Sequence, residues 1–350
     1  MCKLEKKKSL LIVHPSNDFT GSTKVLSNVI KQNFLNCNVT VLTIDKREGF
    51  LSNIDCVTVK KISFPTFKGK SIFLLSSVLS FFDRIIKVFI LAAHSDLVYI
   101  NTVKPYYAAW IARLQNKPIV WHVHEIFSNK TIPVRIMEYT LCHTNAKFIF
   151  VSKYIAQQYV LSPNSFSEVV YNKLDKDFIQ NSKVREIDRR DRKNILMPAS
   201  LTKAKGIYNY ICLAKIMPHL NFKLVLSAQT DEVKVFIDEI DIPSNCIVLA
   251  QQKNMNQHYE TADLLLNLSI PYLCVETFGM TIIEGFAYGI PAIAPNVGGP
   301  VELIKNGYNG MLVDDVTDLN KLQEAINYIL DIHNYGKYAE NALESSSLYK

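Results

Sequence analysis

The sequence predicts an α/β protein, and two kinds of observation lead to that class. Short apolar runs typical of buried strands recur along the chain with helical patterns between them, as where the run 9–13 is followed by a helix at 24–33. Seven of the 12 glycines fall between Gly279 and Gly310, where the backbone must turn tightly or approach something closely. With 350 residues, of which 48% are hydrophobic and 20% charged, the chain is long enough and apolar enough for two folded domains.

The first half of the chain contains a regular series of apolar runs. Strands are expected at 9–13, 39–44, 57–62, 96–101, 118–124, 147–152 and 169–172, with helices at 24–33, near 106–114 and from 154 onward. Segment 71–93 is the most apolar stretch, but three charged residues interrupt it, so it falls short of the roughly 20 apolar residues of a membrane span. Two interpretations of 71–93 stay open, a helix packed on the sheet and an amphipathic helix lying on a membrane.

The second half begins after a highly charged segment, 175–193, which we interpret as the connection between two domains, 1–174 and 194–350. Strands are expected at 195–199, 222–227, 247–249, 264–268, 291–294 and 311–313, and helices at 207–216, 281–288 and 319–330. The last residues, 331–350, supply little for a further helix.

Charge and cysteine usage limit the compartment and the partners. The seven cysteines are scattered without a C-x-x-C pair, which favours reduced thiols in the cytoplasm, and the apolar run 10–13 is too short for the core of a signal peptide. Residues 261–350 carry a net charge of −7, so residues 1–260 carry +14. A basic front half predicts an anionic surface or substrate, such as phospholipid headgroups, a lipid pyrophosphate or nucleic acid; an ordinary lysine-rich surface is the alternative.

The glycine-rich stretch 276–310 contains the main candidate site. Phe278, Gly279 and Met280 form the turn that enters the helix expected at 281–288, where free N–H groups favour an anion such as phosphate. Glu276 precedes this turn and Glu284 lies about one helical turn inside, so an acceptor-only carboxylate stands on each side, as recognition of neighbouring hydroxyls requires. The alternative is a helix start with two surface glutamates. Neither G-x-G-x-x-G nor G-x-x-x-x-G-K-[ST] occurs, which disfavours dinucleotide oxidoreductases and P-loop proteins.

The pattern E-x7-E with F-G after the first Glu, followed in order by G-I-P, V-G-G and N-G-x-x-G, resembles the family 4 retaining glycosyltransferases. The resemblance implies the GT-B fold, in which two Rossmann-like, doubly wound α/β domains face each other across a cleft. It also implies that Glu276 contacts the donor sugar, that the amides of Phe278, Gly279 and Met280 contact sugar and phosphate, and that Glu284 binds the ribose of the nucleotide.

Four further positions are compared with the family pattern. Lys205, at a strand-to-helix turn, matches the lysine that binds the diphosphate, but Ser200 stands where relatives have an arginine. Gly21 stands where relatives usually have a Gly-Gly pair. His124 lies at the carboxyl end of the strand 118–124, and the resemblance implies that it contacts the donor sugar and acts with Glu276 in catalysis. The spacing H-x-H-E is a weak zinc signal, because no second ligand cluster accompanies it.

The resemblance therefore implies a cytoplasmic retaining transferase that moves a sugar from a nucleotide-diphosphate sugar to a saccharide or lipid-pyrophosphate-linked acceptor in surface polysaccharide biosynthesis. It implies no metal or other cofactor and no nucleic-acid partner, and the basic first half adds contact with the inner face of an anionic membrane. Two alternatives stay open: a GT-B nucleotide-sugar epimerase, and a non-catalytic nucleotide-binding or membrane-scaffold protein, which the missing arginine at Ser200 favours.

Overall fold

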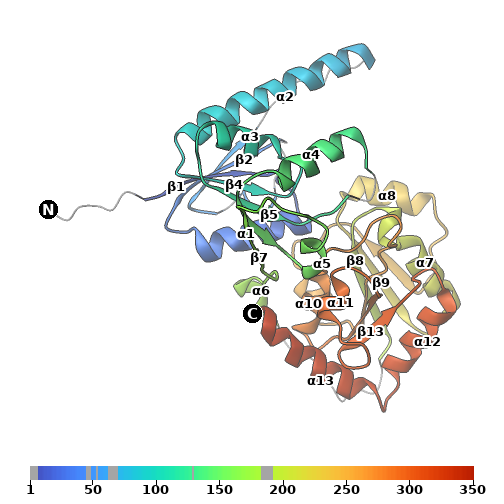
Figure 1. Ribbon diagram of the computed structural model, residues 1–350. Helices are drawn as coiled ribbons and strands as arrows, with labels where there is room; N and C mark the ends of the chain where they lie inside the picture. The colour runs from blue at the N-terminus through green and yellow to red at the C-terminus, as the bar shows by residue number, and fades with distance from the viewer. Residues whose placement is uncertain (1–6, 45–48, 53, 62–69, 128–129, 183–191) are drawn as a thin grey trace. The chain divides into compact units, whose positions relative to one another are not determined.

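The computed structural model of the chain describes residues 7–44, 49–52, 54–61, 70–127, 130–182 and 192–350, with the side chains of 70–78 left aside (Figure 1). The chain divides into two compact units, Met1–Val170 and Tyr171–Lys350. Each unit is an α/β domain with one parallel sheet. Of the charged connection predicted at 175–193, residues 183–191 lie outside the described part, and Lys176–Gln180 forms the short helix α6.

The first unit is built on a seven-stranded sheet in the order β3-β2-β1-β4-β5-β6-β7. Every neighbouring pair runs parallel. Sheets of this kind are covered on both faces, so their central strands are continuously apolar rather than alternating. The strands are β1 Ser9–Val13, β2 Asn38–Thr43, β3 Val57–Lys61, β4 Leu97–Asn101, β5 Ile119–Val123, β6 Lys147–Phe150 and β7 Phe166–Val169.

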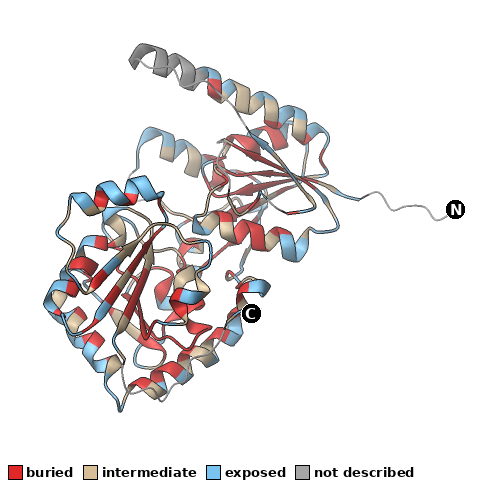
Figure 2. Cartoon of the chain, turned by 180° about the vertical axis from the view of Figure 1, so that it is seen from behind, coloured by how far each residue is buried: buried red, intermediate tan, exposed pale blue. Residues whose placement is uncertain are grey.

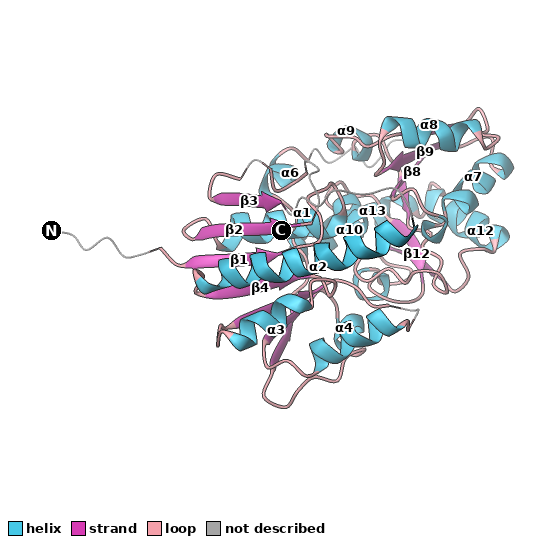
Figure 3. Cartoon of the chain, turned by 90° about the horizontal axis from the view of Figure 1, so that it is seen from above, coloured by secondary structure: helices cyan, strands magenta, loops and turns pink. Residues whose placement is uncertain are grey.

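The direction of winding changes between β1 and β4, which sets the faces that the helices cover. The chain moves outward from β1 to β3, then returns to β4 and continues to β7. Because parallel crossovers are right-handed, the first helix covers one face and the later ones the other. Figures 1 and 3 show α1 on one side of this sheet and α2 and α3 on the other. The helices are α1 Gly21–Asn33, α2 Lys70–Ala93, α3 Tyr107–Leu114, α4 Ile132–Cys142 and α5 Lys153–Ala156.

The second unit repeats the plan with a six-stranded parallel sheet in the order β10-β9-β8-β11-β12-β13. Its winding changes direction between β8 and β11. The strands are β8 Asn194–Ala199, β9 Asn221–Leu226, β10 Cys246–Leu249, β11 Leu264–Leu266, β12 Ala292–Pro295 and β13 Gly310–Val313. The helices are α6, η1 Lys203–Lys205, α7 Ile207–Ile216, α8 Thr230–Asp238, α9 Asn256–Tyr259, α10 Met280–Phe286, α11 Pro300–Leu303, α12 Leu319–Leu330, α13 Tyr335–Ser346 and η2 Ser347–Tyr349.

Each sheet carries its own hydrophobic core, visible as the buried strands of Figure 2. In the first unit Leu10 and Ile12 of β1 pack with Leu26 and Ile30 of α1. In the second unit β8, β9 and β11 pack against α7 and α12. Burial of this apolar surface is the main force that holds each sheet to its helices. Two separate cores account for two units that are each compact.

Several elements differ from the prediction. The prediction of little helix in 331–350 is wrong, because α13 occupies most of that segment. Its packing face is made of tyrosines and alanines, Tyr335, Tyr338, Ala339 and Ala342, which give a weak apolar signal although they are buried. The last strand of the first unit is β7 at Phe166–Val169 rather than 169–172, since an edge strand carries exposed polar residues and lacks a continuous apolar run. Helices α4 and α8 lie where no element was predicted.

Helix α2 presents two different faces. Val88 and Ala92 are fully buried, so this part of the helix packs on its unit, as one of the two interpretations required. The other face exposes large apolar side chains at helical spacing, Leu79, Phe82, Ile86, Phe89 and Ile90, each between 46% and 56% exposed. No helix in the described part of the chain is long and apolar enough to span a bilayer.

Candidate functional site

The candidate site of the second unit lies where the winding of its sheet changes direction. Adjacent parallel strands β8 and β11 end at the same edge, and their loops lead away to opposite sides. A crevice between such loops is where open α/β sheets bind ligands. The loop after β8 carries Lys205, and the loop after β11 carries Glu276. The fold therefore brings to one edge two residues that are 71 positions apart.

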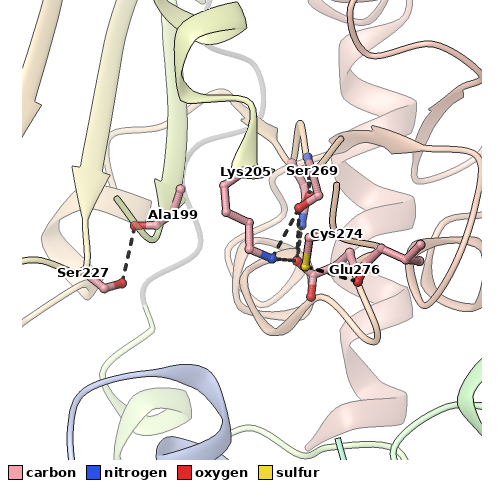
Figure 4. A network of polar contacts seen from close by, with 8 residues as sticks. Ala199, Lys205, Ser227, Ser269, Cys274 and Glu276 are labelled. Carbon is pink, nitrogen blue, oxygen red and sulfur yellow. Dashed lines mark hydrogen bonds and ion pairs between the residues drawn. The ribbon is translucent and has the colours of Figure 1, made fainter. Parts of the chain in front are cut away.

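Lys205 and Glu276 contact each other directly. The Lys205 Nζ atom donates a hydrogen bond to Glu276 Oε2 over 2.7 Å. Asn267 Nδ2 and Ser269 Oγ also donate to Oε2, each over 3.4 Å, and Figure 4 shows Ser269 beside both charged groups. All of these contacts reach one carboxylate oxygen. No described residue hydrogen-bonds to Oε1 of Glu276, so this oxygen is left as an acceptor for a ligand.

The electrostatic balance of this pair keeps both groups charged. Burial by itself raises the pKa of Glu276, but the charge and hydrogen bond of Lys205, with Asn267 and Ser269, outweigh it and hold the pKa below the ordinary 4.5. For Lys205, burial lowers the pKa, but Glu276 outweighs burial and the pKa lies above 10.5. The site therefore contains a fixed carboxylate and a fixed ammonium group at neutral pH.

Three glycines allow the loops of this site to meet. Gly206 has φ +73°, and a Cβ there would overlap the carbonyl oxygen of Leu268. Gly298 has φ +80°, and a Cβ there would overlap the carbonyl oxygen of Glu276. That same oxygen accepts a hydrogen bond from the Gly299 N–H over 2.8 Å. At Gly206 and Gly298 only glycine combines a left-handed backbone with so close an approach, so these two residues hold the Lys205 and Glu276 loops in place.

Phe278 anchors the turn that follows Glu276. The residue is 3% exposed, and its ring centroid lies 6.1 Å from that of Tyr171 and 6.4 Å from that of Tyr349. The Tyr171 hydroxyl donates to Glu302 Oε2 over 2.9 Å. The aromatic cluster leaves the backbone, rather than the Phe278 side chain, as the part of this turn that a ligand can contact. Gly279, with φ +108°, is the N-cap of α10, and Met280 is the first residue of that helix.

Glu284 lies inside α10, and its side chain is buried. The residue is 4% exposed, and its Oε2 accepts a hydrogen bond from the Tyr259 hydroxyl over 2.6 Å. Tyr259 stacks on Tyr288 and meets the edge of Phe178. The carboxylate is thus held by a hydroxyl group of the protein. Its contact with a ribose stays a prediction.

Two predicted donor-site residues have less specific surroundings. Ser200 directly follows β8 and is half-buried, and its carbonyl accepts from the Thr202 N–H over 2.8 Å. Gly21 is exposed at the start of α1, and a Cβ there would meet nothing within 4 Å. Nothing in its surroundings requires glycine, so the role of Gly21 also stays a prediction.

His124 lies at the corresponding edge of the first unit, directly after β5. It is 8% exposed, and its ring centroid lies 4.1 Å from that of His122, so the two side chains share one face of the sheet. His124 Nε2 is 2.9 Å from Asn101 Oδ1 at the end of β4, and Asn101 Nδ2 is 2.9 Å from His14 Nδ1 just after β1. The three strands are neighbours, so their polar end residues form one cluster.

Burial keeps these imidazoles neutral. It lowers the pKa of His122 to about 3, and His122 Nδ1 lies 2.8 Å from the Tyr99 hydroxyl oxygen. Burial, with the neighbouring His122 and His14, also holds the pKa of His124 well below 6.5. No group of three or more metal-ligating side chains occurs in the described part of the chain.

Comparison with known proteins decides the family. The family model "Glycosyltransferase Family 4" matches residues 31–178, and "Glycosyl transferases group 1" matches residues 178–344. The two matches meet at residue 178 and together account for most of the chain. The chain belongs to glycosyltransferase family 4.

The similar proteins agree with this family. The chain is 26% identical over 196 residues to the N-acetyl-α-D-glucosaminyl L-malate synthase of Bacillus anthracis, covering 53% of this chain and 50% of that protein. It is 29% identical over 144 residues to a GDP-mannose-dependent α-mannosyltransferase of Corynebacterium glutamicum, covering 41% of this chain and 33% of that protein. The chain thus spans about half the length, or less, of these relatives.

The solved structures confirm the fold. Anabaena HepE, solved in complex with UDP and glucose, superposes with a TM-score of 0.77 at 21% identity, covering 97% of this chain and 95% of that one. WaaG, a glycosyltransferase involved in lipopolysaccharide biosynthesis, gives a TM-score of 0.72 at 13% identity, covering 97% and 96%. The predicted GT-B fold with two parallel-sheet α/β domains is therefore confirmed.

Several residues at the two strand edges of this family 4 chain were not predicted from the sequence. Asn267 and Ser269 in the second unit, and His14 and Asn101 in the first, hold the predicted residues in place. The signal that could have found them is a polar residue directly after a buried run, as in L-L-L-N-L-S and L-I-V-H. In a parallel sheet such positions gather at the edge that binds ligands.

Proposed function

We propose that this family 4 protein is a retaining glycosyltransferase that moves a sugar from a nucleoside-diphosphate sugar to a saccharide acceptor. The observation that carries the proposal is the arrangement of Glu276. Lys205, Asn267 and Ser269 hold one of its oxygens, and the other has no partner among the described residues. A carboxylate oriented in this way can accept hydrogen bonds from sugar hydroxyls.

The proposed chemistry uses the charge of Lys205. In the transfer step the bond between the anomeric carbon and the diphosphate oxygen breaks, and the acceptor oxygen bonds to the same face of that carbon. The leaving phosphate takes the proton of the acceptor hydroxyl. Negative charge grows on the diphosphate during this step, and an ammonium group stabilises it there. Lys205 lies 2.7 Å from Glu276, so a phosphate that approaches shares this ammonium group with the carboxylate.

The donor and acceptor are proposed from the relatives. HepE was solved with UDP-glucose, and the Corynebacterium relative is named as dependent on GDP-mannose, so these two donors are the first to test. WaaG is involved in lipopolysaccharide biosynthesis, which supports a lipid-linked acceptor and a role in surface polysaccharide assembly. The proposed transfer uses no metal ion, since Lys205 supplies the positive charge.

The experiment is a comparison of Glu276→Ala with the wild type. Thermal-shift measurements with UDP, GDP and their sugars first identify the donor, because a ligand that binds the folded state raises its stability. Glu276→Ala is then expected to lower kcat on the order of 100-fold while the nucleoside diphosphate still binds. The matched control is Glu324→Ala on the exposed side of α12. Undiminished transfer by Glu276→Ala would contradict the role proposed for this residue.

We also propose that the first unit contacts an anionic membrane surface through α2 and its neighbours. The exposed apolar side of α2 is accompanied by Arg84 and Lys87 on the same helix. Between α3 and α4 a surface pocket is lined by apolar and aromatic residues together with two arginines, Trp110, Ile132, Ile136, Tyr139, Arg113 and Arg135. Apolar side chains flanked by cations are typical of helices that lie in the headgroup region of a bilayer.

A further inference from the structure

A chain of hydrogen bonds connects a carboxylate in the first unit to His124. Asp18 Oδ1 accepts from the Thr23 hydroxyl over 2.8 Å, and Thr23 Oγ1 lies 3.1 Å from His14 Nε2. The Asn101 amide then joins His14 to His124, with 2.9 Å on each side. The chain runs across the carboxyl ends of β1, β4 and β5, which are adjacent in the sheet.

The carboxylate gives this chain a direction. Burial by itself raises the pKa of Asp18, but hydrogen bonds from Ser16, Thr20 and Thr23 outweigh it and lower the pKa to about 2. An ionised carboxylate only accepts hydrogen bonds, so the Thr23 hydroxyl donates its single proton in the hydrogen bond to Asp18. The other acceptors within reach of that proton, the Ser16 carbonyl at 3.4 Å and the Thr20 hydroxyl at 3.5 Å, are farther away and uncharged. The Thr23 oxygen therefore accepts from His14 Nε2–H.

The direction of the hydrogen bonds continues through His14 and Asn101. A neutral His14 that carries its proton on Nε2 presents Nδ1 as an acceptor, so the amide NH2 of Asn101 points to it. The amide oxygen then faces His124 and accepts from Nε2–H. The reversed amide would require protons on both nitrogens of His14. That would place a cation on a side chain that is only 1% exposed, which is costly.

The backbone conformation beside Asn101 also indicates that this cluster of polar residues is functional. Thr102, the next residue, has φ +73°, which is rare for a β-branched residue. Its N–H donates to the His122 carbonyl over 2.9 Å, and its carbonyl accepts from Trp121 Nε1 over 2.8 Å. Strained backbone of this kind persists where surrounding contacts hold it, and such positions cluster at functional sites.

We infer that Asp18, Thr23, His14 and Asn101 are positioning residues that fix His124 as the Nε2–H tautomer, so that its Nδ1 atom accepts a hydrogen bond from a substrate hydroxyl. No described residue hydrogen-bonds to this nitrogen. It is also not one of the fully buried polar atoms that lack a partner, so a ligand can reach it. The ligand class is a hydroxyl donor, as on a saccharide. The inference rests on the proposed function for the identity of that ligand, but the tautomer is a property of the protein alone.

The direct test is nitrogen NMR of the full chain with 15N-labelled histidine. The His124 signals among the eight histidines are assigned from their loss in His124→Gln. We expect a protonated Nε2 and an unprotonated Nδ1 for His124, and the same tautomer for His14. A proton on Nδ1 of His124 in the wild type would overturn the inference, and this result is read from the wild-type protein itself.

The second test interrupts the chain of hydrogen bonds at Thr23, at a distance from His124. Thr23→Val removes the link to Asp18, and we expect a mixture of His124 tautomers and about a tenfold lower kcat with unchanged nucleotide affinity. Thr23→Ser keeps the hydroxyl and should recover the single tautomer. The control is Thr58→Val, the same chemical change at an exposed position of β3. A single, unchanged tautomer in Thr23→Val would contradict the directing role of Asp18.

The two proposals fail in different ways. If no nucleotide sugar supports transfer while His124 carries its proton on Nε2 alone, the proposed function is wrong, and the inference that the hydrogen bonds from Asp18 position His124 is kept. If transfer occurs while His124 carries its proton on Nδ1, the function stands and the chain is rejected.

Discussion

At the scale of single residues, the main finding is that Lys205 and Glu276 are partners. The family pattern assigns one to the diphosphate and the other to the sugar, yet the lysine donates to the carboxylate over 2.7 Å. Each charge reduces the cost of burying the other, because a partly buried charge needs a partner. The pair also limits the rotation of the carboxylate. A substitution of either residue should therefore affect the position of the other.

The pair predicts a pH-dependent stability. Because the folded-state pKa of Glu276 lies below 4.5, the carboxylate stabilises the fold above about pH 4.5, and this contribution is lost as the pH falls through the lowered pKa. The difference in Tm between wild type and Glu276→Gln should be largest near neutral pH and shrink in acid. Thermal unfolding followed by circular dichroism at several pH values measures it. Glu324→Gln on α12 should show no such trend, and a constant difference for Glu276→Gln would refute the role of the pair.

At the scale of elements, the site depends on loops pressed against one another rather than on helix or strand interiors. Gly298 lies against the Glu276 carbonyl and Gly206 against that of Leu268. Both glycines have positive φ, a conformation that costs other residues about 1–2 kcal/mol. Close steric contact between the loops, as well as hydrogen bonds, therefore holds them in position.

Two glycine substitutions distinguish the effect of a steric clash from the effect of a positive φ alone. Gly307 has φ +76° and open space within 4 Å of the point where a Cβ would lie, whereas at Gly298, with φ +80°, that point is blocked. We expect Gly307→Ala to cost about 1–2 kcal/mol in the free energy of unfolding. Gly298→Ala should cost clearly more and should lower transfer activity, because the Glu276 segment must move. Urea denaturation and kinetics measure both effects, and equal costs for the two variants would exclude a steric role for Gly298.

At the scale of the whole molecule, charge differs between the two units. Met1–Val170 contains 21 Lys and Arg against 10 Asp and Glu, a net of +11, whereas Tyr171–Lys350 has a net of −4. The exposed apolar side of α2 belongs to the basic unit. Juxtaposed positive charge and exposed apolar side chains favour an anionic lipid surface over a neutral one.

This distribution predicts how the protein binds vesicles. Co-sedimentation with vesicles containing phosphatidylserine should exceed that with phosphatidylcholine alone, and it should weaken as salt is raised because screening shortens the range of the attraction. Phe82→Glu with Phe89→Glu should reduce binding about tenfold or more, since each phenylalanine contributes about 1.5–3 kcal/mol when buried. Ile332→Glu, at an exposed apolar position of the acidic unit, is the control. Equal binding by the double variant and the control would reject contact through α2.

The class of fold, the strand positions to within a few residues and the family could all be predicted from the sequence. Continuous apolar runs specify buried parallel strands, and the family is indicated by the spacing of the residues in the glycine-rich motif. Lys205, Glu276 and His124 were also predicted as site residues, because each follows a strand or lies in the motif, and their roles in the site stay predictions. Helix α13 was missed because buried alanines and tyrosines give a weak periodic signal.

The contacts between these residues could not be predicted from the sequence and follow from the fold. The contact between Lys205 and Glu276, the burial of Glu284 against Tyr259, and the chain from Asp18 to His124 all join positions far apart in the sequence. Strand order determines such contacts. The reversal of winding between β1 and β4 and between β8 and β11 brings distant strand ends to one edge. Local sequence patterns specify each strand but not its neighbours, so these pairings were beyond the reach of sequence reasoning.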